Sequence, residues 1–371
     1  MIIQVPPLAK GGLGGFFSAY TKINDHAMTV LQNTLYITTP DAYLRLEGDT
    51  VCVMVDDIKK LQVPLHHLSS MVLFDHVMLS PALLGRCAED GRSVIWLTRS
   101  GRFSARLEGP TSGNILLRQA QFRAAEDAAQ PIQFARAFIA GKLRNSRQLL
   151  MRGARESDDA AEKETLVKTA KHLANQVRKL PMVENFDELL GIEGDAARRY
   201  FEVLPLVMKP QVRVDFPFKG RTRRPPRSRF DALISFLYSL ATGDCRAALE
   251  TVGLDPQMGF FHAVRPGRPA LALDLVEEFR SPLADRLALT LVNRAQIQPK
   301  HFEEREGGAV LLNDEGRKAV ITAWQTRKQE EITHPVLQQT VPVGLLPQVQ
   351  ARLLARRLRG DVQYYVPFLQ R

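Results

Sequence analysis

Three acidic side chains stand close together in the segment HAVRPGRPALALDLVEEFR, residues 262–280. Asp274 and Glu277 are three residues apart, a spacing that places both on one face of a helix, and Glu278 follows directly. The residues around them are too apolar for a fully solvated helix, so at least one carboxylate is expected to be partly buried and to need a partner. Either these acids cover a solvated helix face, or they converge with His262 on a cation.

His262 lies twelve residues before Asp274, after the aromatic pair of GFF. The Pro266-Gly267 pair between them predicts a turn that brings the chain back past the helix start. A lone histidine beside aromatic residues is more often a packing residue. A neighbouring carboxylate pair favours metal ligation, for which imidazole is the commonest protein ligand. Arg265 and Arg268 of the same turn would then lie over an anion that the metal holds.

A third acid, Glu193, stands between Gly191 and Gly194 in LLGIEGDAARRYFEVL, residues 189–204, and is expected just before a helix. The helix dipole alone favours an acid there. The glycines would also let a ligand or another backbone approach closely. Two carboxylates and one imidazole from separate segments would suit Mg²⁺ or Mn²⁺, with water and phosphate oxygens completing the octahedron. The imidazole favours Mn²⁺ of the two.

The charge of the chain indicates an anionic partner. The formal net charge is +10 at pH 7, and a phosphate polymer is the commonest partner of so basic a protein. Residues 209–229, KPQVRVDFPFKGRTRRPPRSR, hold eight Lys or Arg against one Asp. Prolines stiffen this segment, which we expect to be an exposed loop. Basic loops are also often merely solvated. The candidate nucleic-acid contacts are Arg221, Arg223 and Arg224 of this segment, together with Arg265 and Arg268.

Composition places the chain among globular proteins, with 371 residues of which 45% are hydrophobic and 24% charged. No apolar run approaches the roughly 20 residues that cross a bilayer, and no signal peptide is evident, so we expect a cytoplasmic protein without membrane contact. Three cysteines without a CxxC pair indicate buried thiols rather than disulfides or a zinc site. They are Cys52, Cys87 and Cys245.

The pattern of elements predicts an α+β protein, with a small β-rich N-terminal domain and a larger all-helical domain. Residues 1–28 read as an appended tail, so we expect the fold to start near Met28. Residues 29–109 carry short β-rich runs and one helix over 80–91. Residues 110–371 carry a 3.6-residue period, with a short strand possible in GGAVLLN. Helices are expected over 114–127, 131–155, 160–180, 193–206, 229–242, 244–252, 271–294, 315–331 and 345–359.

Three motifs in this order resemble one family. They are GIEGDAARRYF, RTRRPPRSRFDALISFLYSL and GFFHAVRPGRPALALDLVEEFRSPLADR, and they are similar to those of the CRISPR adaptation integrase, the universal Cas endonuclease that inserts new spacers. NTLYITTPDAYLRLEGD and SPALLGRCAEDG are similar to its type I-C branch. The resemblance covers roughly residues 28–371.

The resemblance implies a set of site residues. The metal-binding Glu of the family falls on Glu193, its His on His262 and its second acid on Glu277, where many relatives have Asp. Asp274 becomes a supporting acid. Mg²⁺ or Mn²⁺ is the implied cofactor. The implied partners are double-stranded DNA as prespacer and CRISPR repeat, a second copy of the chain, and a small partner Cas protein in a heterohexamer.

The implied activity is metal-dependent phosphoryl transfer, in which a 3′-hydroxyl of a foreign DNA fragment attacks a phosphodiester at the edge of a CRISPR repeat. Two alternatives remain at this stage. A repair nuclease on branched DNA would use the same chemistry without insertion, and a non-catalytic DNA-binding scaffold would need only the charge. Only an integrase yields covalently joined product, and dependence on a divalent metal would exclude the scaffold.

Overall fold

The structure is a computed structural model that describes residues 34–37, 39–68, 70–98, 103–109, 114–222 and 225–370. The expected tail, the start near Met28, and Arg223 and Arg224 lie outside the described residues. The chain divides into two compact units. The first is the chain up to Ser112 with Gln325–Thr333 and Gln339–Leu345, and the second holds the rest.

The first unit is built mainly from two four-stranded sheets, of order β4-β3-β2-β6 and β1-β5-β7-β8. Their inward faces form a core of Leu44, Val51, Leu73 and other apolar side chains, against which helix α2 contributes the buried Leu83. Gly48, with a φ of +59°, makes the tight turn between β2 and β3. The elements are β1 (Thr34–Ile37), β2 (Tyr43–Glu47), β3 (Thr50–Val55), β4 (Ile58–Pro64), β5 (Ser70–Phe74), β6 (Met78–Leu79), α2 (Pro81–Glu89), β7 (Ser93–Leu97) and β8 (Phe103–Arg106).

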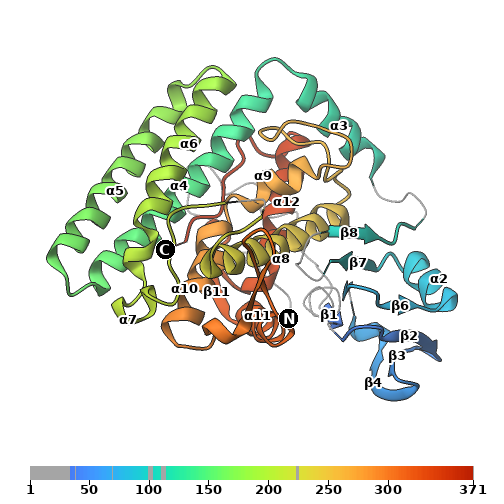
Figure 1. Ribbon diagram of the computed structural model, residues 1–371. Helices are drawn as coiled ribbons and strands as arrows, with labels where there is room; N and C mark the ends of the chain where they lie inside the picture. Colours follow the sequence, from blue (N-terminus) through green and yellow to red (C-terminus); the bar gives the residue numbers. More distant parts are fainter. Residues whose placement is uncertain are drawn as a thin grey trace. The chain divides into compact units, whose positions relative to one another are not determined.

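The second unit is predominantly helical. Helices α4, α5 and α6 lie side by side, and α8 packs against α9 and α12 (Figure 1). The helices that follow β8 in sequence are α3 (Ile115–Glu126), α4 (Gln130–Glu156), α5 (Ala160–Lys179), α6 (Phe186–Val203), α7 (Pro210–Arg213), α8 (Arg229–Val252), α9 (Ala270–Val276), α10 (Arg286–Asn293), α11 (Asp314–Gln329) and α12 (Leu346–Leu358). The last residues of α11, from Gln325, belong to the first unit. Two antiparallel hairpins follow α10 in sequence, β9 (Phe302–Arg305) with β10 (Ala309–Leu312), and β11 (Glu331–His334) with β12 (Gln339–Pro342).

The α+β fold class is confirmed, since a β-rich N-terminal region precedes a predominantly helical part. The second part is not all-helical, because the β9-β10 hairpin belongs to it. The later segments 325–333 and 339–345 group with the first unit, so a single boundary near residue 110 does not account for them. The three cysteines are buried and free, as expected. In the described part of the chain no helix combines the length and apolarity needed to span a bilayer.

Three local predictions need correction. The segments 229–242 and 244–252 form one helix, because Gly243 is tolerated inside α8. The expected helix over 271–294 is interrupted, since α9 stops at Val276 and a π-helical turn, Arg280–Asp285, precedes α10. The basic segment 209–229 is not simply an exposed loop. Its residues Phe216 and Phe218 are buried, so apolar side chains tie it to the core of the second unit.

Candidate active site

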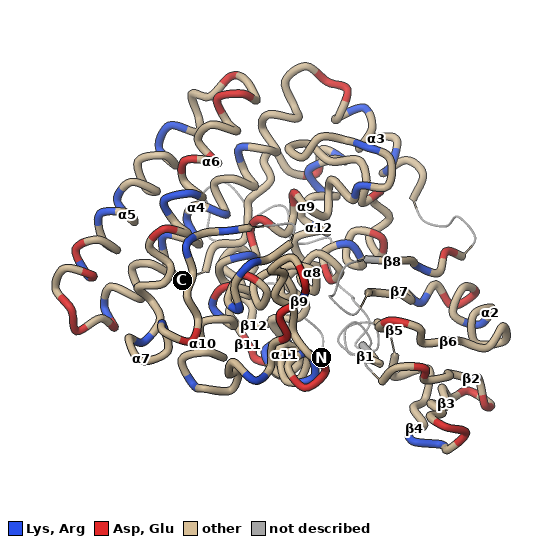
Figure 2. Tube along the Cα trace, viewed as in Figure 1, with Lys and Arg blue, Asp and Glu red and all other residues tan. Residues whose placement is uncertain are grey.

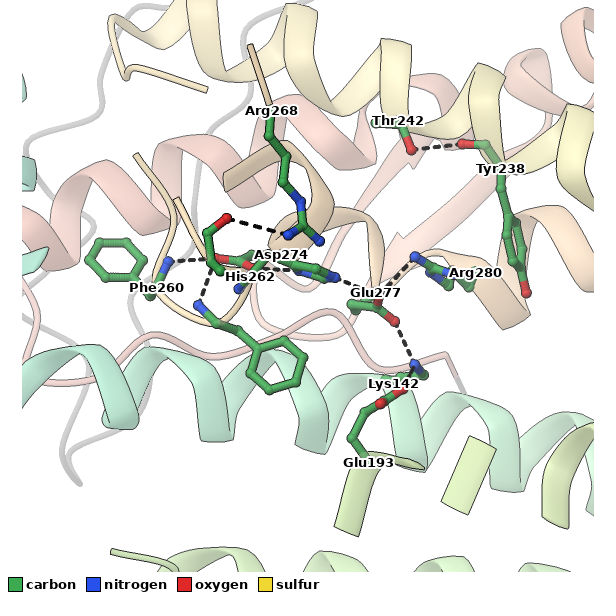
Figure 3. Close-up of polar contacts among 12 residues, drawn as sticks. Lys142, Glu193, Tyr238, Thr242, Phe260, His262, Arg268, Asp274, Glu277 and Arg280 are labelled. Carbon is green, nitrogen blue, oxygen red and sulfur yellow. Dashed lines mark hydrogen bonds and ion pairs between the residues drawn. The ribbon is translucent and has the colours of Figure 1, made fainter. Parts of the chain in front are cut away.

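Asp274 is the buried anchor of the site (Figure 3). Its Oδ2 accepts the backbone N–H groups of Phe260 at 2.6 Å and Phe261 at 3.0 Å. Its Oδ1 accepts the backbone N–H of His262 at 2.8 Å and lies 2.8 Å from the Nδ1 of the same residue. Four donors around one carboxylate replace the water that its burial removes, which is the condition for burying a charge. Asp274 therefore fixes both the backbone and the ring of His262.

The close approach of segment 259–262 to α9 depends on Gly259. A Cβ at this position would lie 2.7 Å from the carbonyl carbon of Ala270 and 2.8 Å from Asp274 Oδ2. The chain then turns at Pro266 and Gly267, where the N–H of Arg268 donates to the carbonyl of Arg265 at 3.0 Å and Gly267 has a φ of +73°. The predicted turn is present, and it returns the chain to the start of α9.

The His262 ring is oriented toward Glu277. Because the Asp274 carboxylate is an acceptor, the His262 Nδ1 donates to it, which leaves Nε2 as the ring nitrogen that faces Glu277. That Nε2 lies 3.8 Å from Glu277 Oε1. A histidine that donates one ring nitrogen to a carboxylate and presents the other outward is the usual arrangement of a metal-binding imidazole.

Glu277 leaves the helical path of α9. After Val276 the chain makes i to i−3 hydrogen bonds through Glu277, Glu278 and Phe279, and the π-helical turn begins at Arg280. Such π-type irregularities are frequent at functional sites. Burial on its own would raise the pKa of Glu277, but the charges of Arg280, Lys142 and His262 outweigh it and lower the pKa to about 2. Arg280 Nη2 lies 2.9 Å from Glu277 Oε1.

Glu193 reaches the same place from α6. It lies within the helix Phe186–Val203 and not just before a helix, so the expected first-turn position is wrong. The side chain meets the Lys142 ammonium of α4, whose Nζ donates to Glu193 Oε1 and lies 2.8 Å from Glu277 Oε2 (Figure 3). Glu193 and Glu277 thus share one cation, although they come from different helical segments.

Glu278 does not belong to this cluster. It accepts hydrogen bonds from the Tyr365 hydroxyl, from Gln350 Nε2 at 2.9 Å and from the backbone N–H of Phe368 at 2.7 Å. Burial raises its pKa to about 8, against the opposing effect of these donors. The interruption at Glu277 therefore separates two consecutive acids, one directed to the cluster and one to the C-terminal segment.

The predicted DNA contacts differ in placement. Arg265 is exposed, and Arg268 is half-buried with its guanidinium 3.4 Å from the carbonyl of Ala263. Arg221 points inward, in contrast to the expectation. It pairs with the buried Asp231 at 3.1 Å and stacks over the Tyr238 ring at 4.9 Å. Its charge is already engaged inside the second unit. In Figure 2, Lys and Arg also recur along α4, α5 and α6, interspersed with acids.

Three residues of the site were not predicted from the sequence. Lys142 stands in a helix whose apolar period gave no sign of a partner 51 residues away. Arg280 lies three residues after Glu277, a spacing that would have indicated an ion pair. Gly259 precedes the aromatic pair and could have been noticed as a position of close backbone approach.

The types of these residues suit a divalent cation, but their side chains are spaced too widely to enclose one. Among the described residues, no three His, Cys, Asp or Glu side chains are grouped closely enough, as they stand, to hold a metal ion. The Lys142 ammonium, however, occupies a position where one cation contacts both Glu193 and Glu277. Carboxylate oxygens and an oriented imidazole are ligands that Mg²⁺ and Mn²⁺ accept. The ammonium therefore lies between the two carboxylates.

Comparison with known proteins identifies the family of the chain. The family model described as CRISPR associated protein Cas1 matches residues 35–326. A CRISPR-associated endonuclease Cas1 from Moorella thermoacetica is 51% identical over 344 residues, covering 93% of this chain and 100% of that protein. Two solved structures share the fold. A Cas1 protein from Thermotoga maritima superposes with a TM-score of 0.77 at 24% identity, over 91% of this chain and 100% of that one.

The second structure is a casposase bound to an integration product, with a TM-score of 0.76 at 18% identity over 90% of this chain and 92% of that one. The similarity to these two structures, at such low identities, establishes the shared fold. The family model and the Moorella relative establish the family. The matched residues include the whole cluster around Asp274 and Glu277. The chain belongs to the CRISPR-associated Cas1 family.

Proposed function

We propose that the chain is a divalent-metal-dependent DNA endonuclease and integrase of CRISPR spacer acquisition. The observation that carries the proposal is that Lys142 contacts both Glu193 and Glu277, while His262 Nε2 lies 3.8 Å from Glu277 Oε1 and Asp274 fixes the imidazole. The relative from Moorella is named as an endonuclease, and the casposase structure holds an integration product. Both agree with chemistry on DNA.

Each residue has a defined task in this proposal. Glu193, His262 Nε2 and Glu277 would hold Mg²⁺ or Mn²⁺, which supplies Lewis-acid polarisation of the target phosphate when bound. Asp274 orients the His262 ring so that Nε2 faces Glu277. Arg280 keeps Glu277 ionised. Burial on its own would raise the pKa of this carboxyl, but the charge of Arg280 helps to lower it to about 2. A carboxylate that stays ionised remains available as a ligand.

The reaction is a transesterification. The oxygen of a fragment's 3′-hydroxyl forms a new bond to the target phosphorus and gives up its proton to solvent. The bond from that phosphorus to the old 3′ oxygen breaks, and the released 3′ oxygen takes up a proton from solvent. One phosphodiester is exchanged for another, so no external energy source is needed. Water in place of the hydroxyl would give hydrolysis at the same site, which accounts for an endonuclease activity.

The remaining partners are also proposals. DNA is expected to lie against Arg265 and Arg268, with Arg223 and Arg224 as further candidates, and its affinity should fall steeply with salt because phosphate contacts release counterions. Arg221 is withdrawn from this set because it is already paired with Asp231. Family membership supports a homodimer and a heterohexamer with a small partner Cas protein.

The test compares DNA integration by the wild type with integration by variants that each lack one proposed metal ligand. Glu193→Ala, His262→Ala and Glu277→Ala should each abolish covalent joining of a linear fragment to a supercoiled array in the presence of the partner protein and Mn²⁺ or Mg²⁺. Glu202→Ala is the matched control, because Glu202 lies on the same helix as Glu193 but is 53% exposed. Circular dichroism checks that each variant is folded.

The outcomes separate the alternatives. Full joining by one of the three variants would remove that residue from the ligand set. Cleavage of branched DNA with no joined product would favour a repair nuclease. Equal DNA binding by all variants, with neither cleavage nor joining in the wild type, would favour a non-catalytic scaffold.

A further inference from the structure

Lys142 is a nearly buried cation between the two proposed acidic ligands. It extends from α4, and its side chain is 11% exposed. Its Nζ contacts Glu193 Oε1 and lies 2.8 Å from Glu277 Oε2. Lysine is almost never buried unless it is paired, and here one ammonium is paired with two carboxylates. This is the position that a metal ion would take if it used both acids.

The two acids do not depend on Lys142 for their general placement. Glu193 projects from the middle of α6, and the other oxygen of Glu277 is held by Arg280 at 2.9 Å. The His262 ring is held by Asp274. A divalent ion could therefore find its ligands in place after the ammonium moves away, and Lys142 has four rotatable side-chain bonds with which to move.

We propose that Lys142 is the counter-ion of the metal-free site, and that a divalent cation displaces its ammonium from Glu193 and Glu277 on binding. The inference rests on the proposed metal site. Without a cation, two carboxylates at one point would repel each other in a poorly hydrated place. The ammonium removes that repulsion, but an incoming ion must break both contacts, so Lys142 lowers the affinity of the empty site.

The test measures Mn²⁺ affinity of the full-length protein without DNA, by electron paramagnetic resonance of the free ion. Lys142→Gln should bind Mn²⁺ about tenfold more tightly than the wild type, a coupling of ordinary size. Lys142→Arg keeps the charge and should stay close to the wild type. Arg144→Gln is the matched control, because Arg144 lies on the same helix and is exposed. Its Mn²⁺ affinity should be unchanged.

A second measurement separates competition from a purely structural role. In EDTA, Lys142→Gln should unfold at a lower urea concentration than the wild type, and saturating Mn²⁺ should close that gap. If Lys142 were only structural, the same variant would lose both stability and Mn²⁺ affinity, and the inference would be overturned. Unchanged affinity would overturn it too.

The wild type distinguishes failure of the inference from failure of the proposed function. If the wild type binds Mn²⁺ and Lys142→Gln binds it no more tightly, only the inference is wrong. If neither protein binds Mn²⁺, the metal site and the inference are both wrong. If Lys142→Gln binds Mn²⁺ and the wild type does not, the inference is supported, because the ammonium of the wild type then blocks the site completely.

Discussion

Replacing Asp274 by Asn tests the structural reasoning most directly. The change keeps the shape of the side chain and replaces one carboxylate oxygen by an NH₂ group. Both oxygens face donors, because Oδ1 takes the His262 backbone N–H and ring Nδ1 while Oδ2 takes the N–H groups of Phe260 and Phe261. With its NH₂ group at the Oδ2 position, the amide opposes the backbone N–H groups of Phe260 and Phe261. With its NH₂ group at the Oδ1 position, it opposes the backbone N–H of His262, and the ring can accept from it only in the tautomer that carries its proton on Nε2.

The cost follows from these contacts. Hydrogen bonds to a charged group contribute about 1.5 to 3 kcal/mol each, so the loss of one or two of them amounts to about 1.5 to 6 kcal/mol. Relaxation of the loop would offset part of this, and we expect a loss of about 3 kcal/mol. The His262 ring also loses its fixed orientation. Removal of a residue that orients a metal ligand typically weakens metal binding by about 10 to 100-fold.

The assay is urea unfolding followed by tryptophan fluorescence. The chain has two tryptophans, of which Trp324 is buried in the second unit, and a Trp96→Phe background leaves its signal alone. With a slope of about 3 kcal/mol per M, the midpoint should fall by about 1 M. The control is Asp187→Asn, an exposed acid in the first turn of α6. An Asp274→Asn midpoint equal to that of the control would refute the account of Asp274 as the anchor.

Two further predictions concern other parts of the second unit. Gly259→Ala should lower the unfolding free energy by about 1 to 3 kcal/mol, because the new Cβ would lie 2.7 to 2.8 Å from atoms of Ala270 and Asp274. Thermal unfolding measures this loss, and an unchanged melting temperature would contradict it. Burial lowers the pKa of His334 from 6.5 to about 4, although its hydrogen bond to Gln350 acts in the opposite direction. As the pH falls, His334 is protonated at a higher pH in the unfolded chain than in the folded one. The free energy of unfolding therefore decreases between pH 6.5 and pH 4, by a total of about 3 kcal/mol. Urea midpoints across this range should show the loss, and His334→Gln should remove most of it.

The amino-acid sequence determined the elements whose signals are local. Short β-rich runs indicated strands in residues 29–109, and the 3.6-residue period indicated the helices after residue 110, because both patterns depend only on near neighbours. The same holds for the turn at Pro266 and Gly267, where the residue types set the backbone angles. The acids, His262 and the ordered motifs were also visible in the sequence, as was their resemblance to one family.

The break in the helix at Glu277 was decided by tertiary contacts. The sequence favours a continuous helix from 271 to 294, but the structure turns at Glu277 and continues as a π-helical turn. This places Glu277 against Lys142 and Glu278 against Tyr365. Helical propensity is worth only a few tenths of a kcal/mol per residue, so buried ion pairs and hydrogen bonds can override it.

The partners of the charged side chains were settled only by the fold. Lys142 meets Glu193 across 51 residues of sequence, and Arg221 turns inward to Asp231 and Tyr238 in a segment whose composition indicated an exposed loop. A charge in a sequence shows that a partner or solvent is needed, but not which one. That choice depends on which helices pack together, because a buried charge is tolerated only where the packing brings an opposite charge or a set of donors to it.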